Sequence, residues 1–284
     1  MMNASYSLAP LTTQAVTVVW LRQCFRLNEN PLYHHAHQLG LPVVIVTIHA
    51  PHDSHAPDWQ LGEAAQGWLH ATLHAHAQQL EATYQQPLLT LKASTAVEAL
   101  TQLKQALPNL THLITDERWE PHAKQQQTHV AQWASDAGVN FHVHNTSVLQ
   151  HPAQRKNKQG NPFQVFTPFW KHSLPLLHEE ATAPISPPTS LPRLNEVATL
   201  AELLEVLPCA VTLEALGYRP RLPWYPALMS HWQAGEAGAE ALLQQFLAHA
   251  VHGYKEDRNV PSVAGTSKLS PYLQVGAISP WRVF

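Results

Sequence analysis

Residues 16–21 read VTVVWL, an unbroken run of apolar and β-branched side chains. A strand buried on both faces of a parallel sheet requires such a run, because helices cover it above and below. A second run, PVVIVTI, follows at residues 42–48, and weaker ones occupy residues 87–91, 111–115 and 140–144. The sequence therefore predicts five strands before residue 145.

Segments with a helical period separate these runs. Apolar side chains recur three or four positions apart within residues 65–80, 97–107 and 130–137. Strands that alternate with helices predict a Rossmann-like α/β domain over residues 16–145. We expect an open, parallel, five-stranded sheet with helices on both faces.

An open α/β sheet binds ligands beyond the C-terminal ends of its strands, where the strand order reverses. After the first strand the chain reads RQCFRLN, with neither G-x-G-x-x-G nor a glycine-lysine phosphate loop. A standard dinucleotide or P-loop site is therefore not expected there. Arg22 and Arg26 in this turn either bind an anion or pair with carboxylates, and physical reasoning from the sequence favours neither.

The alternating pattern stops near residue 145. Residues 146–235 are predicted to be an interdomain linker region, which includes the stiff proline-rich stretch PISPPTSLP at residues 184–192. A helical period returns after Gly238, so residues 236–284 are predicted to begin an α-helical domain. Residues 1–15 precede the first strand and are expected to form a disordered tail.

Composition limits the partners and the compartment. The 284 residues are 45% hydrophobic and 13% charged, with a formal net charge of −3. This charge creates no general attraction for nucleic acid, so a DNA partner would need a local basic patch. Cys24 and Cys209 are expected to be buried free thiols in a reducing compartment. There is no secretory signal and no membrane-length apolar run, so we expect a cytoplasmic protein without a membrane partner. A monomer is also expected.

The 20 histidines raise the question of a metal centre. No H-E-x-x-H, no C-x-x-C and no carboxylate at ligand spacing accompanies them, so solvated histidines are expected and no metal is predicted. The groupings considered are His34, His35 and His37, and His70, His74 and His76.

The loop GTSKLS at residues 265–270 is a candidate anion site. Glycine lets the backbone approach an anion closely, and Ser or Thr at the start of a helix lies beside free N–H groups that attract phosphate. The alternative is a polar loop that only caps a helix. Ser279 and Pro280 give a further helix-start signal near residue 284.

Four segments, in order, resemble motifs of the photolyase and cryptochrome family, most closely those of bacterial cyclobutane pyrimidine dimer photolyases. They are WLRQCFRLNENPL at 20–32, VFTPF at 165–169, Tyr254-x-x-x-Arg258 with Pro261, and GTSKLSPYL at 265–273. Three positions depart from the motifs, where Cys24, Glu29 and Asn259 replace aspartate. The change at Cys24 puts local pairing with Arg22 or Arg26 in doubt.

The resemblance implies a light-driven DNA repair enzyme with two domains. The α/β domain would hold an antenna chromophore, a folate or a deazaflavin, and the helical domain would hold FAD near UV-damaged DNA. Arg258 matches a DNA-contacting position, and Glu120 aligns roughly with an antenna-contacting acid. The positions matched to FAD contacts are Tyr254, Thr266, Ser267, Lys268, Leu269 and Ser270.

The resemblance also implies that the family chain continues about as far again, so this chain is expected to be truncated at its C-terminal side. No catalytic residue is predicted, and residues 1–284 alone are expected to bind FAD poorly and to repair nothing. Two alternatives stay open: a cryptochrome-like blue-light receptor without repair activity, and a stand-alone α/β ligand-binding module.

Overall fold

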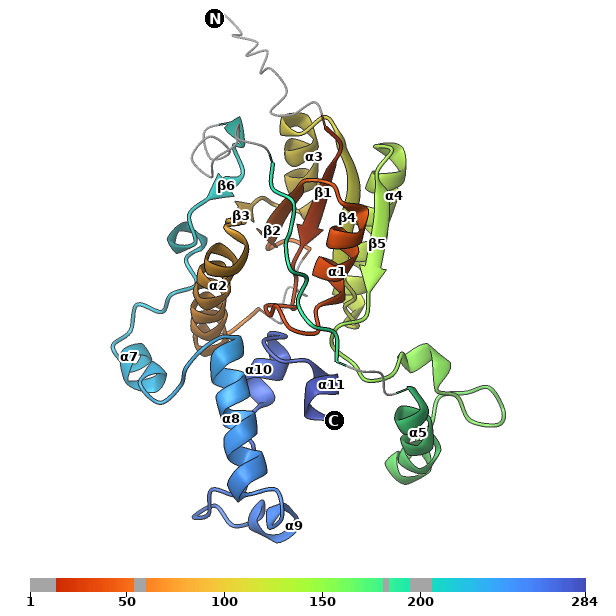
Figure 1. The fold of residues 1–284 in the computed structure, drawn as a ribbon, viewed down its shortest axis with the longest axis vertical. Coiled ribbons are helices and arrows are strands. Elements are labelled where there is room, and N and C mark those ends of the chain that lie inside the picture. The colour runs from red at the N-terminus through yellow and green to blue at the C-terminus, as the bar shows by residue number, and fades with distance from the viewer. Residues whose placement is uncertain (1–13, 54–59, 181–183, 195–205) are drawn as a thin grey trace, which may run out of the picture.

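A computed structural model describes residues 14–53, 60–180, 184–194 and 206–284. It contains one sheet with the strand order β5-β4-β1-β2-β3-β6 (Figure 1). The strands are β1 Val16–Trp20, β2 Val43–His49, β3 Leu88–Lys92, β4 Leu110–Asp116, β5 Asn140–His144 and β6 Ala210–Val211. The prediction for residues 1–13 lies outside the described residues.

The predicted parallel sheet is confirmed. Strands β1 to β5 coincide with the five apolar runs, and every pair among them is parallel. All five side chains of β1 are buried, which explains why its sequence shows no polar alternation. A sixth strand, β6, pairs antiparallel with β3 through Thr90 and Val211. It is only two residues long, too short to leave a period in the sequence.

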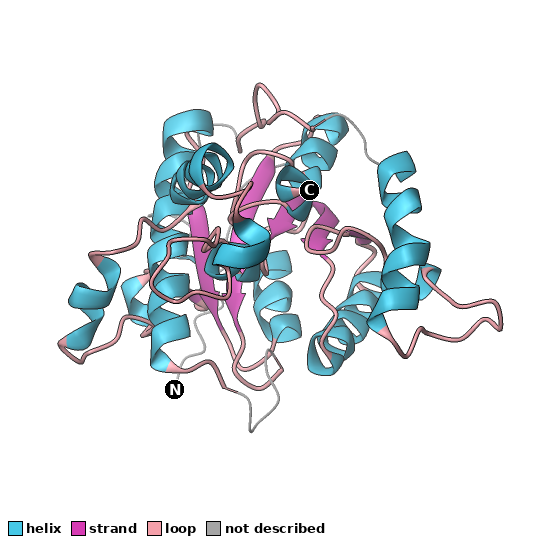
Figure 2. Ribbon diagram, turned by 90° about the horizontal axis from the view of Figure 1, so that it is seen from below, coloured by secondary structure: helices cyan, strands magenta, loops and turns pink. Residues whose placement is uncertain are grey.

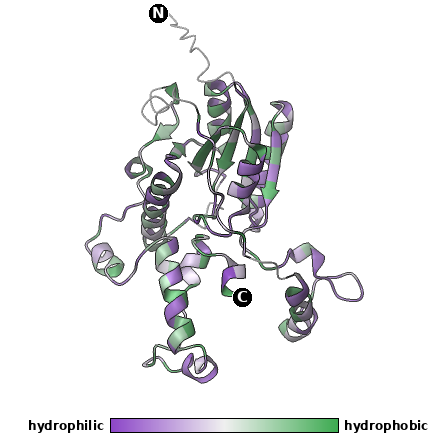
Figure 3. Ribbon diagram, in the orientation of Figure 1, coloured by the Kyte–Doolittle hydropathy of each residue, from purple (hydrophilic) through white to green (hydrophobic). Residues whose placement is uncertain are grey.

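Helices cover both faces of the sheet (Figure 2). Helices α1 and α2 contribute buried side chains to the core on one face, and α3 and α4 to the core on the other. In Figure 3 the central strands are mostly in the hydrophobic colour, whereas the helices around them carry a mixture of hydrophilic and hydrophobic residues. The bounds are α1 Pro31–Leu39, α2 Glu63–Tyr84, α3 Ala96–Ala106 and α4 Pro121–Asp136.

Helix α1 was not among the predicted helices, although its start is encoded locally. The side-chain oxygen of Asn30 accepts the N–H of Leu32 at 3.0 Å, and Pro31 occupies the first turn. Asparagine before proline is a helix-start signal, because the cap satisfies a free amide and proline has none to satisfy. With nine residues, α1 is too short to show a strong period.

The C-terminal segment is helical, as predicted. It contains α8 Glu236–His249, α9 Tyr254–Asp257, α10 Ser270–Gln274 and α11 Pro280–Val283. The hydroxyl of Ser279 accepts the N–H of Trp281 at 3.2 Å, which confirms the expected cap. Leu243, Tyr272 and Ile278 are buried in the core beneath α1 and α2, so the segment packs on the α/β sheet. The domain boundaries stay a prediction.

The predicted linker region contains α5 Phe166–Glu180 and α7 Trp224–Met229, which lie on opposite sides of the molecule (Figure 1). Its proline-rich stretch is extended and is held by side chains of the α/β domain. The ring of His37 bonds the carbonyl of Ser190 at 2.8 Å, and the hydroxyl of Tyr84 donates to the carbonyl of Pro188 at 2.9 Å.

Cys24 and Cys209 are buried free thiols, as expected. Across the described ranges, no helix has the length and apolar character needed to cross a membrane. In the same part of the chain, no group of three or more His, Cys, Asp or Glu side chains is placed to hold a metal ion.

Four histidines meet between α1 and the edge of the sheet. Nδ1 of His35 lies 2.8 Å from Nε2 of His144, and Nδ1 of His112 lies 3.0 Å from Nε2 of His142. The rings of His35 and His142 are 4.5 Å apart. A pair of imidazoles shares one hydrogen bond only while at least one ring is neutral. Burial lowers the pKa of all four rings, that of His144 to about 4.

We expect this cluster to make the fold sensitive to mild acid. An unfolded histidine titrates near pH 6.5. Between about pH 6.5 and pH 4 the unfolded chain therefore binds more protons than the folded chain, and the free energy of unfolding decreases as the pH is lowered. Thermal unfolding at about pH 7.5 and about pH 5 measures the effect. His144→Asn should reduce this pH dependence, whereas replacing the exposed His129 by Asn should not. Equal pH dependence in the wild type and His144→Asn contradicts the assignment.

Candidate functional site

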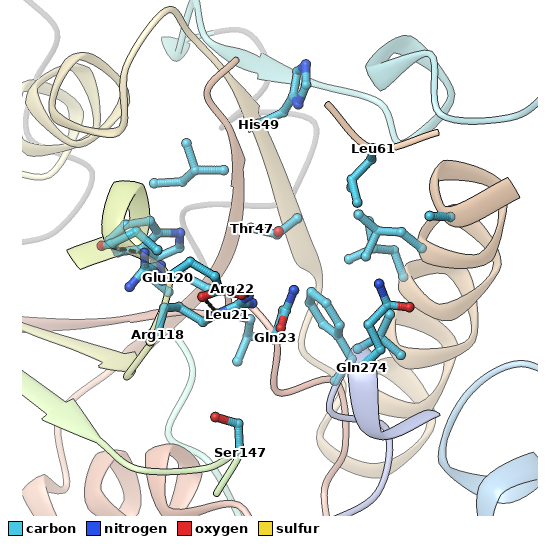
Figure 4. Close-up of a pocket in the computed structure, with 18 of the residues that line it drawn as sticks. Leu21, Arg22, Gln23, Thr47, His49, Leu61, Arg118, Glu120, Ser147 and Gln274 are labelled. Carbon is cyan, nitrogen blue, oxygen red and sulfur yellow. Dashed lines mark hydrogen bonds and ion pairs between the residues drawn. The ribbon is translucent and has the colours of Figure 1, made fainter. Parts of the chain in front are cut away.

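A cavity of about 470 Å³ opens at the C-terminal ends of β1, β2 and β4. Strand β2 lies next to one edge of β1, and β4 lies next to the opposite edge of β1. This is the point at which the strand order reverses, where open α/β sheets bind ligands. Figure 4 shows Arg118 and Glu120 on one side of the cavity, Leu61 and Gln274 across from them, and Thr47 between.

The turn after β1 forms the floor of the cavity. The carboxylate of Asp116, at the end of β4, accepts the backbone N–H of Arg22 at 2.7 Å and that of Gln23 at 3.0 Å. The guanidinium of Arg22 donates to the carbonyl of Ala123 at 3.0 Å and to Oε1 of Gln126 at 2.8 Å. Burial lowers the pKa of Arg22 to about 10, and Asp116 opposes that shift. Arg22 therefore stays charged but is bound to protein groups.

Cys24 stands where the motif has aspartate, yet Arg22 and Arg26 both have hydrogen-bond partners. Arg26 is fully buried and donates only to backbone carbonyls, those of Glu29, Thr146 and Gly276. The thiol of Cys24 is itself buried, and burial raises its pKa to about 12. This thiol is therefore neutral and unreactive at physiological pH.

The segment after β4 forms one wall. Nε of Arg118 donates to Oε2 of Glu120 at 3.2 Å, and both side chains line the cavity. Burial acts to raise the pKa of Glu120, but the hydrogen bond and charge of Arg118 outweigh it and lower the pKa to about 2. Between them, the indole of Trp119 lies 4.2 Å from the ammonium of Lys124. The structure thus places Glu120 at the cavity, where the resemblance suggests an antenna contact.

Helix α2 and the segment after β6 close the opposite side. Ala65, Leu69 and Leu73 of α2 line it with apolar side chains. The hydroxyl of Tyr218 lies 2.5 Å from Nδ1 of His49 at the end of β2. Burial raises the pKa of Tyr218 to about 12, so its hydroxyl remains protonated. The cavity is therefore apolar on one wall and polar on the other, as small-molecule sites usually are.

Two tryptophans beside the cavity have buried indole N–H groups without a partner in the part of the chain that the structure describes. Trp20 and Trp119 both line it, and within the described residues neither buried indole N–H has an acceptor. Buried donors normally find a partner. Both indole nitrogens are shielded from solvent and do not open onto the cavity, so the fit to a planar ligand depends on its volume and its lining side chains.

The residues matched to FAD contacts lie elsewhere, on the C-terminal segment. Tyr254 begins α9 and is 40% exposed, with its ring packed edge-on against Phe246. Thr266, Lys268 and Ser270 are exposed, Ser267 is half-buried, and Leu269 is buried beneath them. None of these side chains lines the cavity at the sheet.

Gly265 joins the third and fourth motif segments. A Cβ at Gly265 would lie 2.5 Å from Cβ of Asp257 and 2.7 Å from its carbonyl carbon. Glycine is therefore required for the loop to pack against α9. Among the described residues, the backbone amides of Thr266, Ser267 and Lys268 have no hydrogen-bond acceptor. The loop has amides available for an anion, as the anion-site interpretation requires.

Arg258 makes no ion pair with its described neighbours Glu256 and Asp257, which was the alternative considered. Its guanidinium instead lies over the ring of Tyr254, 5.5 Å from the ring centre. Arg258 and Tyr254 thus form one exposed surface next to the loop.

Most of the cavity residues were not predicted. Of the residues considered from the sequence as binding residues, Glu120 and Arg22 line it. The available signal was the position of Arg22 and Gln23 after the first strand and of Arg118 and Trp119 after the fourth. The order of the strands, which the sequence does not reveal, brings these two segments together.

A family model described as DNA photolyase matches residues 17–189. The deoxyribodipyrimidine photo-lyase of Agrobacterium fabrum is 31% identical over 271 residues, covering 95% of this chain and 52% of that protein. Cryptochrome-2 of Arabidopsis thaliana is 25% identical over 268 residues, covering 94% of this chain and 42% of that protein.

Among solved structures, a bacterial class III photolyase from Agrobacterium tumefaciens superposes with a TM-score of 0.81 at 28% identity. The match covers 99% of this chain and 54% of that one. The chain spans about half the length of the curated relatives it matches.

Proposed function

Because this chain belongs to the DNA photolyase family, we propose that its cavity holds a light-harvesting chromophore and that residues 236–284 contribute to FAD binding. The complete activity proposed is light-driven repair of cyclobutane pyrimidine dimers in DNA. A bound flavin would supply the light-driven electron transfer, and the protein positions the chromophores and the DNA.

The cavity at the reversal of strand order carries this proposal. Its volume of about 470 Å³ suits a planar ring system such as a pterin or a deazaflavin. Trp20 and Trp119, which line the cavity, would pack beside the ring. The Arg118–Glu120 pair would orient polar substituents, and the apolar wall of α2 would exclude water from the ring faces.

The C-terminal loop would bind the phosphates of FAD. The free amides of Thr266, Ser267 and Lys268 and the ammonium of Lys268 supply donors and positive charge. The hydroxyls of Ser267 and Ser270 would add donors, and Tyr254 would contact the nucleotide beside them. Arg258 would contact a DNA phosphate, because its guanidinium has no carboxylate partner among the described residues.

We expect residues 1–284 alone to bind FAD weakly and to repair nothing. Tyr254, Thr266, Lys268 and Ser270 are exposed, so they offer a surface and no enclosing pocket. A ligand that stays largely in water gains little from apolar burial. The absorbance spectrum of the purified chain measures bound flavin, and a stoichiometric flavin spectrum contradicts this expectation.

Titration of the purified chain with a 5-deazaflavin and with a methenyl-folate tests the chromophore site, using ligand fluorescence as the signal. Ala65→Trp places an indole in the cavity and should weaken binding by about 100-fold or more, because a filled site cannot also hold the ring. The matched control is Ala64→Trp on the same helix, since Ala64 is exposed and does not line the cavity. Unchanged binding to Ala65→Trp, or no binding of either ligand to the wild type, contradicts the site.

Signalling without repair is the second candidate, because plant cryptochrome-2 matches nearly the whole chain. The proposed chromophore site serves either function. A repair assay on the full-length protein with DNA that contains pyrimidine dimers separates them: repair under blue light supports the first candidate, and its absence with flavin bound supports the second.

A further inference from the structure

Residues 151–172 carry a local positive charge that the whole chain lacks. This stretch, HPAQRKNKQGNPFQVFTPFWKH, holds four of the 17 Lys and Arg residues and none of the 20 Asp and Glu residues. The chain as a whole has a formal charge of −3. A nucleic-acid partner of such a chain requires a local basic patch.

The centre of this stretch folds into a tight hairpin. Lys156 and Pro162 form an antiparallel bridge, and the side-chain oxygen of Asn157 accepts the N–H groups of Gln159 and Asn161, each at 3.0 Å. The N–H of Asn157 donates to the carbonyl of Asn161 at 2.7 Å, and Gly160 adopts a positive φ of 80°. These bonds fix the turn, so its lysines are presented at low cost in backbone entropy.

The hairpin projects from the body of the molecule together with α5 (Figure 1). Phe163 connects the two, with its ring 6.0 Å from that of Phe169 and 5.3 Å from that of His172. Lys156 and Lys158 are exposed and form no ion pair with any residue that the structure describes. Their charge is therefore available to a partner.

We propose that the hairpin of residues 155–162 binds the phosphate backbone of duplex DNA, as a contact separate from Arg258. Lys156 and Lys158 are the binding residues, and the contact is independent of base sequence. This inference depends on the proposed function, since that function supplies DNA as the partner.

The neighbouring surface favours a nucleic acid over an acidic protein. Phe166 is 70% exposed and stacks on Trp170 with an interplanar angle of 13°. Basic residues next to exposed aromatic rings are typical of surfaces that follow a nucleic-acid backbone and stack on unpaired bases. In this proposal the hairpin lysines supply the phosphate contact, and the exposed ring of Phe166 is available to stack on an unpaired base.

Fluorescence anisotropy of the purified 284-residue chain with a labelled, undamaged DNA duplex tests the contact. At about 50 mM salt, Lys156→Gln/Lys158→Gln should weaken binding roughly five- to tenfold and reduce the slope of log affinity against log salt by about 2. The matched control is Arg219→Gln/Arg221→Gln, which removes the same charge from exposed residues preceding α7, on the opposite side of the molecule (Figure 1).

An unchanged slope in the lysine variant overturns the proposal, as does an equal loss in the arginine control or the absence of binding at low salt. Displacement of DNA by polyglutamate as effectively as by unlabelled duplex also overturns it, because the hairpin would then be a general anion site. The failure of this proposal can be distinguished from the failure of the proposed function. DNA binding by the hairpin is measured without any chromophore, and repair by the full-length protein could still occur if the lysine variant kept the salt dependence of the wild type.

Discussion

Replacing Gly276 by alanine should destabilise the protein by at least about 3 kcal/mol. Gly276 has a φ of 66°, and a Cβ there would lie 2.0 Å from the carbonyl oxygen of Gln23 and 2.9 Å from the Cα of Cys24. These are backbone atoms of the turn after β1, so no side-chain rotation can relieve the contact. The C-terminal segment and the turn would have to separate. Urea unfolding followed by circular dichroism measures the loss.

Gly40→Ala provides the control for this prediction. Gly40 has nearly the same φ, 64°, but nothing lies within 4 Å of its Cβ position. Alanine there should cost only the left-handed backbone strain, about 1–2 kcal/mol. If both variants lose the same amount, then close packing between the C-terminal segment and the turn contributes nothing beyond backbone strain.

Arg26→Met should cost about 3–5 kcal/mol. The guanidinium is 2% exposed and donates to the carbonyls of Gly276 at 3.0 Å, Thr146 at 3.0 Å and Glu29 at 3.1 Å. It therefore ties the turn after β1 to the C-terminal segment and to the end of β5. Methionine has a similar length but no donor, so the carbonyls of Gly276 and Thr146, in buried hydrogen bonds, and that of Glu29, in a partly buried one, lose their partner.

The exposed Arg282 supplies the comparison. It pairs with Glu240 at 2.7 Å, and both side chains are more than a third exposed. Arg282→Met should change the unfolding free energy by no more than about 1 kcal/mol, since water competes for such pairs. Thermal unfolding of both variants gives the difference. A loss at Arg26 no larger than that at Arg282 contradicts the role given to the buried arginine.

The sheet was predictable because each strand is encoded within its own sequence. β1 and β2 are continuous apolar runs, and helix α3 shows its buried face at helical spacing. The order of strands was not predictable, since no local pattern records which strands pair. Strand β6 was missed for a related reason: its pairing with β3 depends on contacts more than a hundred residues apart in sequence.

The two candidate sites differ in what the sequence revealed. The loop at residues 265–270 is contiguous, so its glycine and hydroxyls could be interpreted directly as an anion site. The cavity combines Trp20, Thr47, Trp119 and Tyr218 from four separate segments. Glu120 was named in advance from the resemblance to photolyases, and Arg22 from its place in the turn after the first strand. The crossover from β3 to β4 brings together residues that are far apart in the sequence, so they form no motif with a recognisable spacing.

A crystal structure of the chain grown with a 5-deazaflavin or a methenyl-folate tests the central claim most directly. We expect the ring system in the cavity between the ends of β1 and β4, with its polar edge against Arg118 and Glu120. A ligand bound only outside this cavity would contradict the account.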